Sequence, residues 1–294
     1  MNLIDSIPDR CIKIFSLDYD LVPESRYPTQ LQQAARAYDY LLTSTPADKI
    51  IFAGDSAGAA IQISLLFHIA KPSPDIQSGR RPLSQPKGVI LISPWCQLDT
   101  KHQTLSRPPE AVDEDYLDIS MLHEYARLYT GATKVSHSSS LLFPLQFYFA
   151  AFLRLYRQLF YAQYTSNWIS GAKAAVHESQ VDPRDWAIHS FLCKSPYRNP
   201  FAAIDYPEWL ADAFPINTLI VYGGKEVMAG DITVFTNALK KVSKGTVEVR
   251  SRWEQGWHVW PLVLMYLGKD QEEASLGIKI ISDFIKSVTN STVA

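Results

Sequence analysis

A serine between two glycines is the first feature of this 294-residue sequence that could do covalent chemistry. It is Ser56, at the centre of GDSAG (Gly54–Gly58), which follows the apolar run Lys49–Gly54 and precedes a segment with helical periodicity. Between a strand and a helix, the flanking glycines let the chain turn sharply and hold the serine in a strained, exposed position. The alternative interpretation is an ordinary glycine-rich turn, but the strand–turn–helix context favours a nucleophile. The following helix would offer N–H groups and a positive dipole to an oxyanion.

A nucleophilic serine needs a base, and the base needs a carboxylate to orient it. Where the nucleophile lies in such a sharp strand–turn–helix segment, called the elbow from here on, the three residues follow along the chain in the order serine, acid, histidine. Of seven histidines, only His258 lies after the apolar run Thr246–Arg252 and before the last helical pattern, in a loop-like segment. A catalytic histidine must reach the carboxyl edge of the sheet beside the serine, so we predict His258 as the base. Structural roles are predicted for the other six, which are His68, His102, His123, His137, His177 and His189.

Two carboxylates follow the apolar run Asn217–Gly223, where the acid of such a triad belongs. Glu226 is closer to the end of the predicted strand. Asp231 is typical of the N-cap of the helix that follows. We therefore predict Glu226 as the acid, with Asp231 as the alternative.

Short apolar runs alternate with helical patterns along the chain, which predicts an α/β fold. The runs that read as strands are Cys11–Leu17, Lys49–Gly54, Lys87–Ser93, Asn217–Gly223 and Thr246–Arg252. The helical patterns between and after them are Thr29–Leu42, the segment after the elbow, Asp231–Lys241 and Glu272–Val288. Nearly continuous apolar strands alternating with helices indicate a mostly parallel sheet that helices cover on both faces.

The stretch Thr100–Pro215 interrupts this alternation. It is rich in aromatic residues and contains helical patterns at Tyr116–Tyr129 and Leu145–Tyr164. We predict a helical cap inserted into the fold. The predicted organisation is therefore residues 1–99 as the first part of the core with the elbow, 100–215 as the cap, and 216–294 as the second part of the core.

The aromatic stretch Leu145–Tyr164 has two interpretations. It is predicted to be a cap helix that packs over the active site. The alternative is that its aromatic face, with Arg154 and Arg157, contacts a membrane surface or admits a lipid-like substrate. A membrane span is not expected, because the uncharged part, Leu141–Leu153, has 13 residues where a span needs about 20.

The charge balance and the missing motifs argue against several classes of function. The chain has 28 Lys and Arg against 30 Asp and Glu, so no basic face for nucleic acid is expected. HExxH, P-loop and GxGxxG patterns are absent from the sequence, so no metal or cofactor is predicted. Three dispersed cysteines and an N-terminal MNLIDSIPDR without an apolar run indicate a cytoplasmic location, with the endoplasmic-reticulum membrane surface as the alternative.

Several segments together resemble the hormone-sensitive-lipase-like branch of the α/β-hydrolases, which contains esterases and deacylases. They are DYDLVPE (Asp18–Glu24), GDSAG, Ser93-Pro94-Trp95, GGKEV (Gly223–Val227) and GWH (Gly256–His258). The resemblance covers about residues 11–100 and 215–285 and implies an α/β-hydrolase fold. It also implies that Ser56 is the nucleophile, Glu226 the acid, His258 the base and the Ala57 N–H an oxyanion donor. The acid of this branch is usually Asp, so Glu226 departs from the common form.

The larger departure is the absence of the HGGG-type loop that supplies further oxyanion N–H groups in this branch. The strand Cys11–Leu17 would correspond to the family's fourth, which implies a fold truncated at its N-terminal side. Three arrangements are open: Cys11–Leu17 pairs directly with Lys49–Gly54, the sheet has a gap, or the sequence comes from a shortened gene model. Loss of one oxyanion donor costs about 2.7–4 kcal/mol of transition-state stabilisation, so impaired hydrolysis is an alternative expectation.

These features predict a serine hydrolase that cleaves apolar acyl or acetyl esters through an acyl-enzyme. The expected partner is a hydrophobic small-molecule ester. Two alternatives follow from the same residues: a catalytically impaired member that binds a small molecule, and an acyltransferase-type tailoring enzyme.

Overall fold

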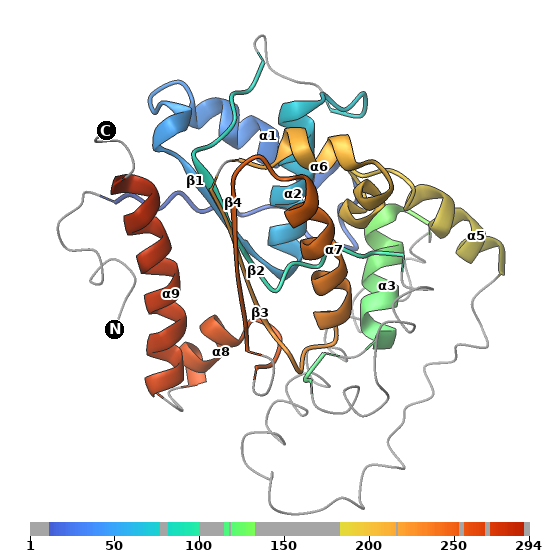
Figure 1. The fold of residues 1–294 in the computed structure, drawn as a ribbon. Helices are drawn as coiled ribbons and strands as arrows, with labels where there is room; N and C mark the ends of the chain where they lie inside the picture. Colours follow the sequence, from blue (N-terminus) through green and yellow to red (C-terminus); the bar gives the residue numbers. More distant parts are fainter. Residues whose placement is uncertain are drawn as a thin grey trace, which may run out of the picture.

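A parallel sheet of four strands forms the centre of the described part of the molecule (Figure 1). The computed structural model describes residues 12–76, 82–99, 115–117, 119–132, 183–215, 217–252, 256–267 and 271–290. The strands lie in the order β1 (Ile51–Asp55), β2 (Gly88–Ile92), β3 (Asn217–Gly223) and β4 (Thr246–Arg252). The predicted parallel sheet is confirmed, and these four strands agree with the apolar runs to within two residues at each end.

The strand register places the carboxyl ends of β1, β2 and β3 at one edge of the sheet. Asp55 is level with Ile92, and Ile92 is level with Val221. The chain therefore leaves β1 into Ser56, leaves β2 into Ser93 and leaves β3 toward Glu226 at the same edge. Parallel sheets place their functional loops at this edge, so the topology brings together residues more than 100 positions apart.

Alternate residues of the strands face two separate hydrophobic cores, as the period of two along a strand requires. The first core takes Val89, Leu91, Ile220 and Tyr222, and the second takes Ile90, Ile92, Leu219 and Val221. Helices α1 (Thr29–Leu41), α2 (Ser56–Ala70), α6 (Pro207–Ala213) and α7 (Ala229–Val242) contribute to the first core. Helices α8 (Trp260–Leu267) and α9 (Gln271–Asn290) contribute to the second. The sheet is thus covered on both faces, as predicted (Figure 1).

Helix α2, which begins at Ser56, is the most deeply buried helix of the first core. Most of its residues are apolar, and the run Ile63 to His68 is buried throughout. The ring of Phe67 packs edge-on against Trp209 of α6, with 5.8 Å between the ring centroids. This packing anchors the helix whose first residue is the candidate nucleophile.

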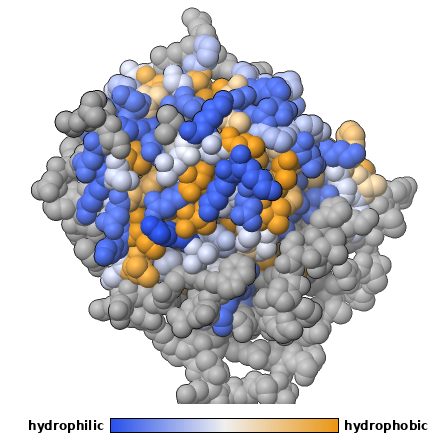
Figure 2. Space-filling view, in the orientation of Figure 1, coloured by the Kyte–Doolittle hydropathy of each residue, from blue (hydrophilic) through white to orange (hydrophobic). Residues whose placement is uncertain are grey.

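The outer helices have an amphipathic pattern that fits their places on the surface. In α7, Ile232, Phe235 and Leu239 are buried, whereas Lys240 and Lys241 are exposed. Figure 2 shows hydrophilic and hydrophobic residues interspersed over the described part of this face of the molecule. No helix among the described residues has the length and apolar character needed to cross a membrane.

The strand predicted at Cys11–Leu17 is wrong for the residues that the structure describes. Residues 12–17 form neither helix nor strand, and Ile14 and Phe15 are 67% and 52% exposed. Among the described residues β1 pairs with β2 alone, so direct pairing of the N-terminal segment with β1 is also wrong. Apolar, β-branched residues make a strand only where a neighbouring strand accepts their hydrogen bonds and packs on their side chains.

The predicted cap contains several described helices. These are α3 (Ile119–Thr130), α5 (Pro183–Leu192), the 3₁₀ helix η5 (Pro200–Asp205) and α6. Helices α3 and α5 contact each other, whereas η5 and α6 pack on α2 and α7. The helical pattern predicted at Leu145–Tyr164 lies outside the described residues, and the division into 1–99, 100–215 and 216–294 stays a prediction.

Candidate active site

Ser56 lies in a sharp turn between β1 and α2. Its φ of +48° is in the left-handed region, which residues with a side chain rarely adopt. Gly54 makes the turn sterically feasible, since a Cβ there would lie 2.8 Å from the carbonyl carbon of Gly58. Such close approach of backbone to backbone needs glycine. This turn geometry agrees with the elbow predicted from GDSAG.

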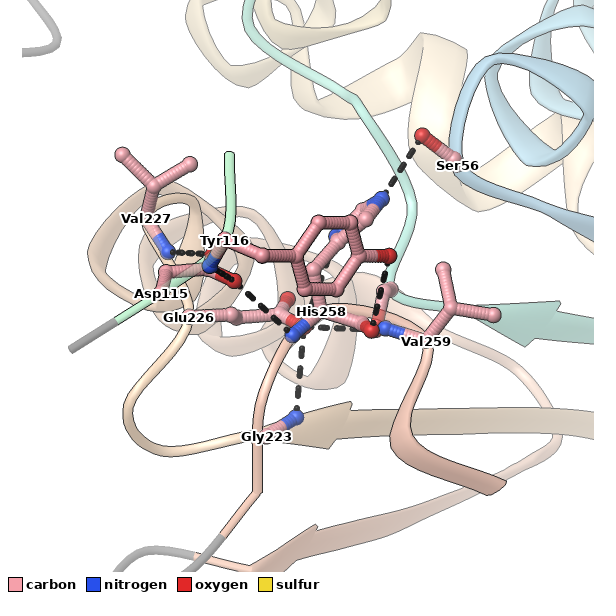
Figure 3. Close-up of polar contacts among 9 residues, drawn as sticks. Ser56, Asp115, Tyr116, Gly223, Glu226, Val227, His258 and Val259 are labelled. Atoms are coloured by element: carbon pink, nitrogen blue, oxygen red, sulfur yellow. Dashed lines mark hydrogen bonds and ion pairs between the residues drawn. The ribbon is translucent and has the colours of Figure 1, made fainter. Parts of the chain in front are cut away.

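His258 lies next to Ser56. Its Nε2 is 2.9 Å from the Ser56 Oγ (Figure 3). The histidine is buried, in the loop between β4 and α8. The helix α8 that follows this loop was not predicted from the sequence. The separation allows the neutral imidazole to accept the serine proton, which is the geometry that a general base requires.

Glu226 is the carboxylate on the other side of the imidazole. Its Oε2 is 3.6 Å from the Nδ1 of His258, an ion-pair separation somewhat longer than a hydrogen bond. The same oxygen accepts a hydrogen bond of 2.6 Å from the Ser93 hydroxyl and one of 3.4 Å from the Gly223 N–H. Burial raises the pKa of Glu226 above its ordinary value, although the neighbouring His258 and Ser93 lower it in part.

The alternative acid, Asp231, has a different place. It lies in the first turn of α7, whose N-cap is Met228, so the prediction that Asp231 caps this helix is wrong. A helix boundary read from sequence is uncertain by a few residues, and here α7 begins two residues before Asp231. Of the two carboxylates predicted from the sequence, Glu226 is the one that lies next to the His258 imidazole.

Ser93 also lies in the site, although no role was predicted for it from the sequence. It is fully buried after β2, with a φ of +44°. Its hydroxyl donates to Glu226 and accepts a hydrogen bond of 2.9 Å from the Val259 N–H. Ser93 therefore links the acid to the loop that carries His258. Only its presence in the Ser93-Pro94-Trp95 segment of the family resemblance distinguished it.

The other described histidines make contacts with residues other than Ser56 and Glu226. The Nδ1 of His68 accepts a hydrogen bond of 3.0 Å from the Ser73 N–H, and burial lowers the pKa of this ring. His189 is 3.0 Å from the Thr130 hydroxyl and 2.8 Å from the Leu98 carbonyl oxygen. His123 packs edge-on against Trp186. His102, His137 and His177 lie outside the described residues.

Ala57 is the second residue of α2, directly after Ser56. The N–H groups in the first turn of a helix have no carbonyl partner within that helix. They also lie at the positive end of the helix dipole. The Ala57 N–H is therefore placed where an oxyanion donor next to Ser56 is expected, and its role stays a prediction.

Residues 9–155 match a family model described as alpha/beta hydrolase fold. The chain therefore belongs to this α/β-hydrolase family, and the resemblance predicted from the sequence is confirmed. The chain is 30% identical over 125 residues to an acetyl-hydrolase of Streptomyces hygroscopicus, covering 42% of this chain and 38% of the relative. It is 25% identical over 107 residues to steryl acetyl hydrolase 1 of Saccharomyces cerevisiae, covering 36% of this chain and 23% of the relative. The chain thus spans less than half the length of these relatives.

Solved structures share the same fold. A hormone-sensitive lipase from a metagenome library is 24% identical with a TM-score of 0.56, and the match covers 92% of this chain and 64% of that one. Carboxyl esterase 2 of Tuber melanosporum is 19% identical with a TM-score of 0.51, and the match covers 92% and 66% of the two chains. The likeness extends over most of this chain, including parts of the predicted cap.

Proposed function

We propose that this protein is a serine hydrolase of carboxylic esters, with Ser56 as nucleophile, His258 as base and Glu226 as acid. The observation that carries the proposal is the 2.9 Å contact between the Ser56 Oγ and the His258 Nε2, at a strained turn between a strand and a helix. Relatives that are named acetyl-hydrolase and steryl acetyl hydrolase support this class of reaction.

The first half of the reaction forms an acyl-enzyme. His258 Nε2 takes the Ser56 proton as Oγ attacks the carbonyl carbon of the ester. The carbonyl oxygen becomes an oxyanion, which the Ala57 N–H and the dipole of α2 stabilise. When the tetrahedral intermediate collapses, the imidazolium gives its proton to the departing alcohol, and the acyl group stays on Ser56.

The second half releases the acid. His258 takes a proton from water, the water oxygen attacks the acyl carbon, and the proton then returns to the Ser56 Oγ as the carboxylic acid leaves. Glu226 orients the imidazole and stabilises its charged form in both halves. The 3.6 Å between Glu226 and His258 suits a contact that tightens as the imidazolium forms.

We further propose an ester with a short acyl group, of which acetate is the simplest, on a hydrophobic alcohol. The names of the two relatives support an acetyl group, and that of the yeast relative supports a sterol-like alcohol. The aromatic residues of the stretch Thr100–Pro215 suit an apolar substrate better than a sugar or a peptide.

A panel of 4-nitrophenyl esters and a steryl acetate tests this proposal. We expect turnover of 4-nitrophenyl acetate and butyrate, slower turnover of the laurate, and release of acetate from the steryl ester. Each rate is compared with that of heat-denatured protein. A folded chain that hydrolyses none of these esters would contradict the proposal, and tight binding of the steryl ester without hydrolysis would favour a binding protein instead.

A further inference from the structure

Two consecutive residues from the segment between β2 and β3, Asp115 and Tyr116, lie against the loops that carry Glu226 and His258 (Figure 3). They are separated from these loops by more than 100 residues in sequence. The Asp115 side chain is fully buried. Burial of a carboxylate is costly unless hydrogen bonds satisfy it, so its partners indicate what it does.

The carboxylate of Asp115 joins two loops: the acid loop after β3, which carries Glu226, and the histidine loop before α8, which carries His258. Its Oδ2 accepts a hydrogen bond of 2.6 Å from the N–H of Val227, the residue after Glu226. Its Oδ1 accepts one of 3.3 Å from the N–H of His258 and one of 2.8 Å from the N–H of Tyr116. One side chain thus fixes the backbone of both loops relative to each other.

Tyr116 holds the other polar group of the His258 backbone. Its hydroxyl donates a hydrogen bond of 3.1 Å to the His258 carbonyl oxygen. Its ring packs beside the imidazole, with 6.0 Å between the ring centroids. Burial raises the pKa of Tyr116, so the hydroxyl remains a donor throughout the neutral range. Between them, Asp115 and Tyr116 hold both the N–H and the C=O of His258.

The loop that carries His258 needs such support because its backbone is strained. Val259, directly after the histidine, has a φ of +55°, which is unfavourable for a β-branched residue. Strained conformations of this kind persist only where the surrounding structure determines them. A shift of about 1 Å at a reacting group can cost about 100-fold in rate, so the hydrogen bonds that hold this loop have direct consequences for turnover.

We propose that Asp115 and Tyr116 are positioning residues that hold His258 in line with Ser56. Asp115 also holds the loop that carries Glu226 in place relative to His258. The inference rests on the proposed ester hydrolysis and extends it. It makes part of the segment between β2 and β3 a component of the catalytic apparatus, in addition to any role in binding substrate.

The variants Asp115→Asn and Tyr116→Phe test this inference. In Asp115→Asn an NH₂ group replaces one carboxylate oxygen and cannot accept the hydrogen bond from the backbone N–H that faces it. Tyr116→Phe keeps the ring but removes the hydroxyl. We expect each to lower kcat about 10- to 100-fold, the range for a lost hydrogen bond to a buried or charged group, with KM changed less than about threefold.

Matched controls are Asp75→Asn, which alters a carboxylate bonded to Tyr27, and Tyr197→Phe, which removes a hydroxyl bonded to the Lys71 carbonyl. These controls should keep the wild-type kcat.

Side-chain ¹⁵N NMR of His258 provides a readout that does not depend on turnover. We expect its ring resonances to shift or broaden in Tyr116→Phe, while thermal unfolding shows that the variant is folded, and to stay unchanged in Tyr197→Phe. Wild-type kcat and unchanged resonances in Tyr116→Phe would overturn the inference, whether or not Asp115→Asn folds. If wild-type protein hydrolyses no ester, the proposed function fails, and the NMR comparison still decides whether these two residues position His258.

Discussion

Replacing Ser56 with alanine is expected to lower kcat for 4-nitrophenyl acetate by about 10⁴- to 10⁶-fold. In the proposed mechanism the Ser56 Oγ attacks the ester, and in the structure this atom lies 2.9 Å from the His258 Nε2. Removing it leaves no group to carry the acyl intermediate. Alanine suits the turn no worse than serine, since both carry a Cβ at the same positive φ, so the variant should keep the wild-type melting temperature.

A second serine of the same helix provides the control for this variant. Ser64 is buried in α2 and its hydroxyl donates to the Ala60 carbonyl oxygen at 3.0 Å. Ser64→Ala removes a hydroxyl from the same helix without touching the site, so it should retain kcat. Residual turnover above about one tenth of wild type in Ser56→Ala would mean that another group is the nucleophile.

Glu226→Gln is expected to combine a large loss of activity with a gain in stability. The loss should be about 10³- to 10⁴-fold in kcat, as for other triads whose acid becomes neutral. The glutamine side chain can still accept hydrogen bonds from Ser93 and Gly223 through its carbonyl oxygen, so the fold of the loop is retained. What it lacks is the negative charge that, in the proposed mechanism, stabilises the imidazolium.

The gain in stability follows from the pKa of Glu226. Burial raises this pKa in the folded protein, so the folded state binds the proton more tightly than the unfolded chain does. Stability therefore falls as pH rises from the ordinary pKa of a glutamate through the raised value. Glutamine has no charge to bury, so the melting temperature of the variant should exceed that of wild type at about pH 8, and the difference should shrink toward about pH 4.

A glutamate far from the triad provides the control. Glu248 of β4 pairs with Arg250 at the surface, where such pairs contribute little to stability. Glu248→Gln should change neither kcat nor the pH dependence of the melting temperature. A Glu226→Gln variant with wild-type kcat would remove Glu226 from the triad. One with a lower melting temperature at pH 8 would mean that the ionised carboxylate stabilises the fold.

The positions of the three main residues of the site were predictable because local patterns mark them. Ser56 and Glu226 each follow a continuous apolar strand, and such strands are recognisable without knowledge of their neighbours. His258 followed by elimination, since only one histidine lies after the strand Thr246–Arg252. The parallel register of the sheet then brought the first two to the same edge.

The supporting residues were not predictable, because their roles depend on contacts over long separations. Ser93 contacts a residue 133 positions later, and Asp115 contacts one 112 positions later. Ser93 was distinguished only by its place in the Ser93-Pro94-Trp95 segment of the family resemblance, and no local pattern marks Asp115. The wrong prediction of a strand at Cys11–Leu17 has a related cause. This segment has the composition of a strand, but whether it pairs depends on a partner strand that its own sequence does not specify.

The assignment of Ser56 and His258 as a catalytic pair is tested by labelling the purified, folded chain with a fluorophosphonate probe and mapping the label by mass spectrometry. The probe reacts with a serine only when a base has activated it. We expect one modified residue, Ser56, with labelling lost in His258→Ala and retained in Tyr197→Phe. A folded chain whose Ser56 stays unlabelled, or is labelled equally well without the His258 imidazole, would contradict the assignment of these residues as a catalytic pair.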